Sequence, residues 1–283
     1  MSELAMRSLI PQVTAWLDED DLHRNFHYTK HLPETPVKLV LKIKSDLVLS
    51  GLDYLVATFC ALGAEARDFD FLKAFEGRTF KTGDVVEFPQ AVSFAQAVTG
   101  ERLALNLVQH ASSISTFTRK FVEQTAGTQV RILDTRKTTP GLRALEKYAV
   151  RVGGGYNHRL GQTDSWMIKD NHKSSLGGLR GAWEFFKAQG AFYNNTIVEI
   201  HDLQELHEAI SLGVRHVMLD NFSSEKIQEA LKFKTKEMTF EVSGGVTLSS
   251  LKSYLAEGVD AISVGALTHS APRVDLSLKF GKK

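Results

Sequence analysis

Residues 196–245 read TIVEIHDLQELHEAISLGVRHVMLDNFSSEKIQEALKFKTKEMTFEVSGG and contain the most regular pattern of the chain. Three short apolar segments, Thr196–Ile200, His216–Leu219 and Thr239–Val242, alternate here with segments of helical periodicity over 202–212 and 224–232. Apolar runs of this length between helical patterns are typical of parallel strands joined by crossover helices. The stretch therefore predicts an α/β fold.

The same pattern continues on both sides of this stretch. It predicts further strands at Arg131–Leu133, Trp166–Ile168 and Ala261–Val264, and further helices over 141–150, 176–189 and 247–257. The part of the chain up to about residue 115 is mixed. There we expect helices over 5–19, 52–62 and 91–124, a strand over 37–43, and a pair of short strands within 79–88 around a turn at 81–84.

Composition limits the classes of function. The net charge is only +1, so there is no broad basic field that would attract nucleic acid or a membrane surface. The single cysteine, Cys60, cannot form an internal disulfide, and we interpret it as a buried structural thiol. The N-terminus has no signal-peptide pattern, and the apolar run 51–64 is too short to span a bilayer. We expect a cytoplasmic protein.

Polar residues and glycines cluster where the predicted strands end. They are Asp134, Lys169 with Asp170, Glu199, Asp220, Ser243-Gly244-Gly245 and Gly265. In a β/α barrel the carboxyl ends of the strands surround one shared pocket. A helix-capping or turn role explains any one of these residues equally well, but it explains the whole set poorly. The set indicates a site for an anionic, metal-dependent substrate.

Cations are densest in three segments of the central region. Arg136 and Lys137 lie in the loop 134–143, and His158 and Arg159 follow the glycine run 153–155. Lys169 comes directly after a predicted strand. Arginine offers a planar fork for carboxylate or phosphate, and lysine offers a compact charge. Each segment taken alone is also compatible with a solvated basic loop.

Two acids and a glycine pair complete the predicted site. Glu199 and Asp220 offer hard oxygen ligands suited to Mg²⁺, with a structural salt bridge as the competing interpretation. Ser243-Gly244-Gly245, followed by a helix that would be capped near Thr247, resembles a phosphate-binding nest, and Gly265 would close it.

Several of these segments resemble the signature of the quinolinate phosphoribosyltransferases. The resemblance rests on residues 101–106, 134–143, 145–151, 153–159, 168–172, 217–222, 242–245 and 262–269, and it extends from about residue 37 to 280. The chain departs from the family pattern at Asp20-Asp21 and 26–29, at Lys44 where an arginine is usual, and at Ser113 where a glycine is usual. In the dimer that the family forms, the change to Lys44 would alter how the partner subunit's active site is completed.

The resemblance implies a fold with two domains. Residues 1–115 would form an N-terminal α/β sandwich that is completed by about 270–283. Residues 116–269 would form an incomplete α/β barrel of about seven strands, of the type II phosphoribosyltransferase kind. It also implies a homodimer with shared active sites, and such dimers can assemble further into hexamers.

The resemblance also implies an activity. The enzyme would join quinolinate to phosphoribosyl pyrophosphate, with Mg²⁺, and release pyrophosphate and CO₂ to give nicotinate mononucleotide for NAD biosynthesis. By resemblance, Arg136, His158 and Arg159 would hold the quinolinate carboxylates, and Lys137 and Lys169 would face both substrates. Glu199 and Asp220 would hold the ribose hydroxyls and Mg²⁺, and Arg102 would enter the partner's site. The 5′-phosphate would be bound by Ser243, Gly244, Gly245 and Gly265, and His269 would belong to the substrate-binding residues.

Three alternatives compete with this interpretation. One is the related protein found with molybdenum transport systems, which looks similar at the Thr-Arg-Lys-Thr stretch but lacks the segment 168–172. Another is a nicotinate phosphoribosyltransferase, which so many cations disfavour because they suit a dicarboxylate. The third is a catalytically silent sugar-phosphate-binding or nucleic-acid-binding protein, against which the net charge and the acids Glu199 and Asp220 argue.

Overall fold

The computed structural model of the chain describes residues 3–20, 23, 26–191, 193 and 195–281. The chain forms two compact units. The first comprises Met1–Phe117, Ala144–Gly153 and Ala271–Lys283, and the second comprises Thr118–Arg143 and Gly154–Ser270.

One segment falls on the other side of the expected domain boundary. We expected residues 144–153 in the second domain, whereas they belong to the first unit. The reason is the apolar face of α5 (Arg143–Val152), whose Leu145 and Ala149 are fully buried. Ser115 Oγ donates a hydrogen bond of 2.8 Å to the Ala149 carbonyl, which anchors α5 to the first unit.

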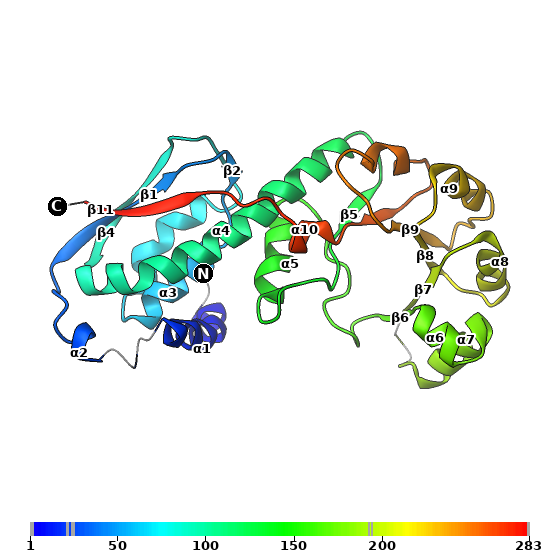
Figure 1. Ribbon diagram of the computed structural model, residues 1–283, viewed down its shortest axis with the longest axis horizontal. Coiled ribbons are helices and arrows are strands. Elements are labelled where there is room, and N and C mark those ends of the chain that lie inside the picture. Colours follow the sequence, from blue (N-terminus) through cyan, green and yellow to red (C-terminus); the bar gives the residue numbers. More distant parts are fainter. Residues whose placement is uncertain (1–2, 21–22, 24–25, 192, 194, 282–283) are drawn as a thin grey trace. The chain divides into compact units, whose positions relative to one another are not determined.

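The first unit is built on a three-stranded antiparallel sheet with the order β11-β1-β4. Its strands are β1 (Pro36–Ile43), β4 (Val85–Ser93) and β11 (Leu276–Gly281). Leu39, Leu41 and Ile43 alternate along β1 and are buried, so one face of the central strand forms part of the core. The last strand of the chain therefore pairs with the first, as Figure 1 shows in red and blue.

The remaining elements of the first unit pack around this sheet. They are α1 (Glu3–Glu19), α2 (Phe26–Thr29), β2 (Leu47–Val48), α3 (Leu52–Ala61), the 3₁₀ helix η1 (Ala66–Ala74), β3 (Thr79–Phe80), the start of α4 (Phe94–Gln124), and α5. The two strands expected within 79–88 do not pair with each other, because β3 pairs with β2 and β4 pairs with β1. Cys60 in α3 is half-buried rather than buried, and burial raises the pKa of its thiol.

The second unit contains a parallel sheet of six strands with the order β5-β10-β9-β8-β7-β6. The strands are β5 (Arg131–Leu133), β6 (Trp166–Ile168), β7 (Thr196–Ile200), β8 (His216–Asp220), β9 (Thr239–Ser243) and β10 (Ala261–Ser263). We expected about seven strands. In the described residues an isolated parallel bridge between Leu133 and Tyr156 extends the sheet beyond β5 at the seventh position.

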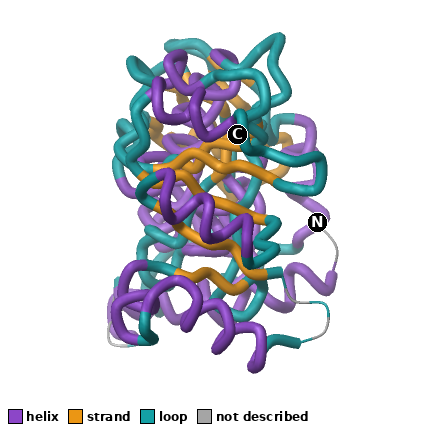
Figure 2. Tube along the Cα trace, turned by 90° about the vertical axis from the view of Figure 1, so that its right-hand side faces the viewer, coloured by secondary structure: helices purple, strands orange, loops and turns teal. Residues whose placement is uncertain are grey.

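Helices cover one face of this sheet, as seen beside β6–β9 in Figure 1 and in purple next to the orange strands in Figure 2. They are α6 (Asp170–Ser175), α7 (Gly178–Gln189), α8 (Leu203–Ser211) and α9 (Ser224–Leu231), and the short α10 (Ala266–His269) follows β10. Alternate strand residues such as Val198 and Ile200 are buried. Their neighbours, including Glu199, point to the opposite face, because successive side chains of a strand alternate.

The helix expected over 247–257 is wrong. A turn follows β9, and only the short 3₁₀ helix η2 (Leu251–Tyr254) forms. Thr247 Oγ1 accepts a hydrogen bond from the Ser250 N–H, and Ser250 Oγ accepts one from the Thr247 N–H. These side-chain bonds give the backbone an alternative to a regular helix. The loop 243–245 therefore lacks the helix N-terminus that we expected behind it.

Candidate active site

A cavity of about 440 Å³ lies at the carboxyl ends of the strands in the second unit. It is lined by Thr135, Arg136, Lys137, His158, Arg159, Met167, Lys169, Glu199, Met218, Asp220, Ser243 and Ser263. Parallel strands deliver their carboxyl ends to one edge, so residues distant in sequence meet there. Eight of the predicted site residues are in this lining.

Gly265, another of the predicted residues, lies against Lys137, and His269 lies against Gly265. A methyl group on Gly265 would come within 3.0 Å of Lys137 Cδ and 3.2 Å of His269 Nε2, so the lysine stem crosses the glycine. Thr268 Oγ1 donates a hydrogen bond of 2.8 Å to the Lys137 carbonyl and fixes the loop after β5 to α10. Gly265 and His269 are not in the cavity lining, but Gly265 lies beside the stem of Lys137, which is.

The two glycines after β9 adopt backbone conformations with positive φ angles. Gly244 has φ 98° and Gly245 has φ 60°. A side chain on Gly244 would collide with the side chain of Asn221 and approach its backbone nitrogen to 2.8 Å. Asn221, which the sequence did not indicate, itself has φ 56° and donates its N–H to the Ser243 carbonyl. The loops after β8 and β9 are thus packed directly on each other.

The cationic side of the cavity is organised by a buried acid. Asp134 is fully buried and accepts hydrogen bonds from Asn157 Nδ2 at 2.6 Å and from the His158 N–H at 2.8 Å. These bonds hold the loop that carries His158 and Arg159 beside β5. Sequence reasoning placed Asp134 at a strand end but assigned no role to it.

Both ring nitrogens of His158 are occupied within the protein. Nδ1 accepts a hydrogen bond of 2.7 Å from the Arg159 N–H, so the proton of the neutral ring resides on Nε2. Nε2 lies 3.1 Å from Glu241 Oε2 and donates to it, and both side chains are largely buried. Glu241 was not predicted as a site residue. Its position within a predicted strand, which is also the position of Glu199, was the signal that could have identified it.

Arg136 and Arg159 bring two guanidinium groups close together. Burial lowers the pKa of Arg159, and repulsion from Arg136 lowers it further. Arg159 Nη1 donates to the Ser165 carbonyl at 2.9 Å, while Arg136 Nε is buried and has no hydrogen-bond partner among the described residues. Adjacent cations with an unused donor favour the binding of an anion.

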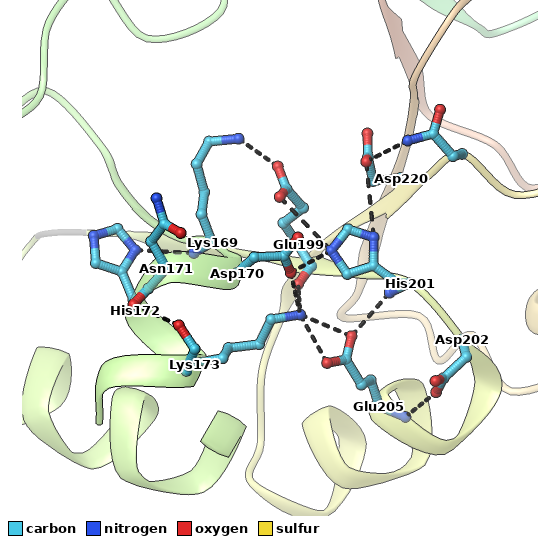
Figure 3. Close-up of polar contacts among 12 residues, drawn as sticks. Lys169, Asp170, Asn171, His172, Lys173, Glu199, His201, Asp202, Glu205 and Asp220 are labelled. Carbon is cyan, nitrogen blue, oxygen red and sulfur yellow. Dashed lines mark hydrogen bonds and ion pairs between the residues drawn. The ribbon is translucent and has the colours of Figure 1, made fainter. Parts of the chain in front are cut away.

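The acidic side of the cavity is carried by the ends of β6, β7 and β8. Lys169 Nζ donates a hydrogen bond to Glu199 Oε2, and the Glu199 side chain is only 10% exposed. Asp220 Oδ2 accepts from Asn221 Nδ2 at 2.7 Å. Figure 3 shows these groups around the imidazole of His201.

His201 was missed by sequence reasoning. Its Nε2 lies 2.5 Å from Asp170 Oδ1 and 3.8 Å from Glu199 Oε1, and its Nδ1 lies 3.7 Å from Asp220 Oδ2. Partial burial acts to raise the pKa of Asp170, but hydrogen bonds from Lys173 and His201 outweigh it and leave that pKa lowered. The available signal was spacing, since residues two apart at a strand end share a face.

Arg102 is not among the residues that line the cavity. It is exposed on α4 in the first unit, whereas the lining of the cavity consists of second-unit residues. Its implied role in a partner's site stays a prediction.

Comparisons with known proteins cover almost the whole chain. The N-terminal domain of quinolinate phosphoribosyl transferase matches residues 25–112, and its C-terminal domain matches residues 114–279. A probable nicotinate-nucleotide pyrophosphorylase (carboxylating) of Bacillus subtilis is 39% identical over 235 residues, which are 83% of this chain and 80% of the relative. Its counterpart from Methanocaldococcus jannaschii is 38% identical over 257 residues, covering 87% and 88%.

Solved structures agree with the sequence comparisons. The crystal structure of NadC from Streptococcus pyogenes superimposes with a TM-score of 0.86 at 33% identity, and the match covers 100% of both chains. The nicotinate-nucleotide pyrophosphorylase of Francisella tularensis gives a TM-score of 0.83 at 30% identity, covering 96% of this chain and 97% of that one. The expected fold class is confirmed.

Proposed function

The chain belongs to the quinolinate phosphoribosyltransferase family, and we propose that it transfers the phosphoribosyl group of phosphoribosyl pyrophosphate to quinolinate. The products are nicotinate mononucleotide, pyrophosphate and CO₂. The observation that carries the proposal is a single cavity that holds the cations Arg136, Lys137 and Arg159 together with the acids Glu199 and Asp220. That combination suits a dicarboxylate and a sugar diphosphate in one site.

The cationic side binds quinolinate in this proposal. The guanidinium groups of Arg136 and Arg159 pair with its two carboxylates, which relieves the repulsion that lowers the pKa of Arg159. Met167 and Met218 line the same cavity and offer apolar surface to the pyridine ring. The ring nitrogen is then directed at the anomeric carbon, so binding supplies orientation.

His158 acts as a positioning residue rather than a direct ligand. Its ring bridges the Arg159 N–H and the Glu241 carboxylate, and this leaves neither ring nitrogen for a substrate carboxylate. The bridge fixes the backbone from which the Arg159 guanidinium extends. This role replaces the direct contact with quinolinate that the family resemblance implied.

The acidic side receives the ribose and the metal. Glu199 and Asp220 present carboxylate oxygens, which fit the preference of Mg²⁺ for hard ligands, and they would hold Mg²⁺ together with the ribose hydroxyls. Bound Mg²⁺ supplies charge neutralisation for the departing pyrophosphate. Departure of the pyrophosphate leaves an oxocarbenium-like ribosyl group, which the two carboxylates stabilise. Lys169, hydrogen-bonded to Glu199, lies where it can contact either substrate.

The 5′-phosphate is placed at the loop after β9. The positive φ angles of Gly244 and Gly245 would present successive N–H groups, and Ser243 adds a hydroxyl. Gly265 lies beside the stem of Lys137, and His269 lies against Gly265. Backbone donors and one lysine would hold the phosphate without a helix N-terminus.

Decarboxylation needs no further cofactor in this scheme. Bond formation between the pyridine nitrogen and the anomeric carbon makes the nitrogen positive. The C–C bond to the adjacent carboxylate then breaks, CO₂ leaves, and the electron pair remaining on the ring carbon is stabilised by that positive charge before it takes up a proton. The protein's part is to hold the ring in place.

The assay that tests the proposal is turnover by the purified chain with phosphoribosyl pyrophosphate, Mg²⁺ and either quinolinate or nicotinate. We expect nicotinate mononucleotide and CO₂ from quinolinate, and no turnover when a chelator removes Mg²⁺. Turnover of nicotinate in preference to quinolinate would contradict the dicarboxylate assignment. Full turnover in chelator would contradict the metal assignment.

We also propose a cytoplasmic homodimer with shared active sites, in which Arg102 reaches the partner's cavity. Arg102 is exposed on α4, so its guanidinium is accessible to a second chain. None of the helices in the described part of the chain has both the length and the apolar character needed to cross a membrane.

Complementation tests the shared site. Arg102→Ala and Arg136→Ala homodimers should each be nearly inactive, and mixing them should restore activity, because a mixed dimer contains one site with both arginines. Random exchange gives about half mixed dimers, so roughly a quarter of wild-type activity should return. If mass spectrometry confirms mixed dimers and no activity returns, Arg102 acts within its own chain.

A further inference from the structure

His201 lies among more carboxylates than a hydrogen-bonding histidine requires. Two carboxylate oxygens converge on one ring nitrogen: Asp170 Oδ1 at 2.5 Å and Glu199 Oε1 at 3.8 Å from Nε2. The three donor atoms all lie within 4.8 Å of one another. They come from the first residue of α6, from β7 and from the residue after β7.

The spacing of these donors brackets that of a metal site. Ligands about 2.1 Å from a tetrahedral cation lie roughly 3.4 Å from each other. The observed separations of 2.5 Å and 3.8 Å fall on either side of that value, and all three atoms lie within 4.8 Å of one another. Shifts of about 1 Å would bring the three atoms around one ion. Glu199 uses its other oxygen, Oε2, for Lys169, which leaves Oε1 facing His201.

The opposite nitrogen of the ring gives an independent indication. Asp220 Oδ2 lies 3.7 Å from His201 Nδ1. A histidine that binds a metal through one nitrogen nearly always directs its other N–H at a carboxylate or carbonyl, which fixes the tautomer. His201 therefore has carboxylate oxygens for a metal shell at Nε2 and an orienting carboxylate at Nδ1 (Figure 3).

The charges of the cluster also leave room for one dication. The groups joined by ion pairs in the cluster are, besides His201, the carboxylates of Asp170, Glu199, Glu205 and Asp220 and the ammonium groups of Lys169 and Lys173. Four negative and two positive charges leave two negative charges when His201 is neutral. A divalent ion would balance them.

We propose that Asp170, Glu199 and His201 form a site for a first-row transition-metal dication of the Zn²⁺ or Co²⁺ type. One imidazole and two carboxylates are a donor set that Zn²⁺ and Co²⁺ accept well, whereas Mg²⁺ prefers oxygen alone and keeps its waters. The site exists in the free protein and requires neither quinolinate nor phosphoribosyl pyrophosphate. It goes beyond the proposed Mg²⁺ position, with which it shares Glu199.

The test is a titration of the untagged, chelator-treated chain with Co²⁺, followed by visible absorption and proton NMR, without any substrate. We expect about one Co²⁺ per chain and one exchangeable, hyperfine-shifted imidazole N–H, the proton that Nδ1 directs at Asp220. His201→Ala should remove that resonance and weaken Co²⁺ binding by about tenfold or more, and Asp170→Asn should weaken binding comparably. Mg²⁺ should bind much more weakly in calorimetry.

A matched control uses another histidine of the same unit. His207 on α8 packs its ring against Phe233, and His207→Ala should leave Co²⁺ binding unchanged. Circular dichroism checks that each variant is folded. The proposal is overturned if Co²⁺ binding does not saturate, or if His201→Ala retains the affinity and the shifted resonance. If His201 serves only as a hydrogen-bond donor to Asp170, binding does not saturate. Because no substrate is present, neither result depends on turnover.

Discussion

The two sides of the cavity in the second unit are built in different ways. The acidic side stands on the ends of neighbouring strands, and its carboxylates are paired in part within the protein, as in the Lys169–Glu199 pair. The cationic side stands on loops that the buried Asp134 holds together, and its guanidinium groups repel each other. The acidic side therefore contains cations of its own, whereas the cationic side places like charges next to each other, and we expect only the cationic side to need an anion to balance it.

The largest effect should follow a change on the acidic side. Glu199→Gln and Asp220→Asn each remove a charge that is in place before the reaction, so we expect kcat to fall by about 10²–10³-fold. Circular dichroism and thermal unfolding should show an intact fold. The control Glu229→Gln, on the exposed side of α9, should retain wild-type kcat. If kcat falls only a few-fold in both variants, the carboxylates of the acidic side do not take part in the reaction.

A smaller effect should follow Arg159→Lys on the cationic side. Lysine keeps the charge and loses the planar fork, so binding of quinolinate should weaken by about tenfold while binding of phosphoribosyl pyrophosphate changes little. Isothermal titration with each ligand separately measures both. Arg180→Lys on α7, where the side chain is exposed, should change neither. If binding of the two ligands weakens equally, the cationic side is not specific for quinolinate.

Two glycines in the loop after β9 distinguish two ways in which an alanine substitution destabilises the fold. One is a collision of the new methyl group, and the other is the strain of a positive φ angle. Gly244→Ala places a methyl group against Asn221 at φ 98°, and we expect it to lower the free energy of unfolding by about 1–3 kcal/mol. Gly245→Ala has open space at φ 60°, so its cost should be smaller. Urea unfolding of both variants measures the difference. Equal costs would show that packing on Asn221 is unimportant.

The smallest effect should follow Glu241→Gln. The amide oxygen can still accept the His158 N–H, so the ring stays in place, and the KM for quinolinate should rise by about threefold or less. Glu241→Leu removes the acceptor and should raise that KM further, with kcat less affected. Steady-state kinetics with quinolinate as the varied substrate distinguishes the two variants. An unchanged KM in Glu241→Leu would mean that His158 does not position Arg159 through this bond.

Much of the second unit was predictable from sequence. All six predicted parallel strands are present. Each could be predicted because a short apolar run between helical patterns is recognised from neighbouring residues alone. Eight of the predicted site residues line one cavity, since polar residues directly after parallel strands share an edge. The identification of the family is likewise confirmed. The roles of individual site residues, the metal and the dimer stay predictions.

Side-chain and packing contacts that the apolar pattern does not show escaped prediction. The helix expected after residue 247 failed because side-chain hydrogen bonds among Thr247 and Ser250 compete with the backbone. Residues 144–153 were assigned to the wrong side of the boundary because the partners of the buried face of α5 are not encoded in its own pattern.

The parallel α/β architecture and the charged residues at the strand ends could be predicted from the sequence, because periodicity and strand-end position are properties of consecutive residues. Three contacts were visible only in the folded chain: Glu241 accepts a hydrogen bond from His158, Asn221 packs on Gly244, and His201 faces three carboxylates. Those contacts join residues brought together by sheet register, and register depends on the packing of the whole unit.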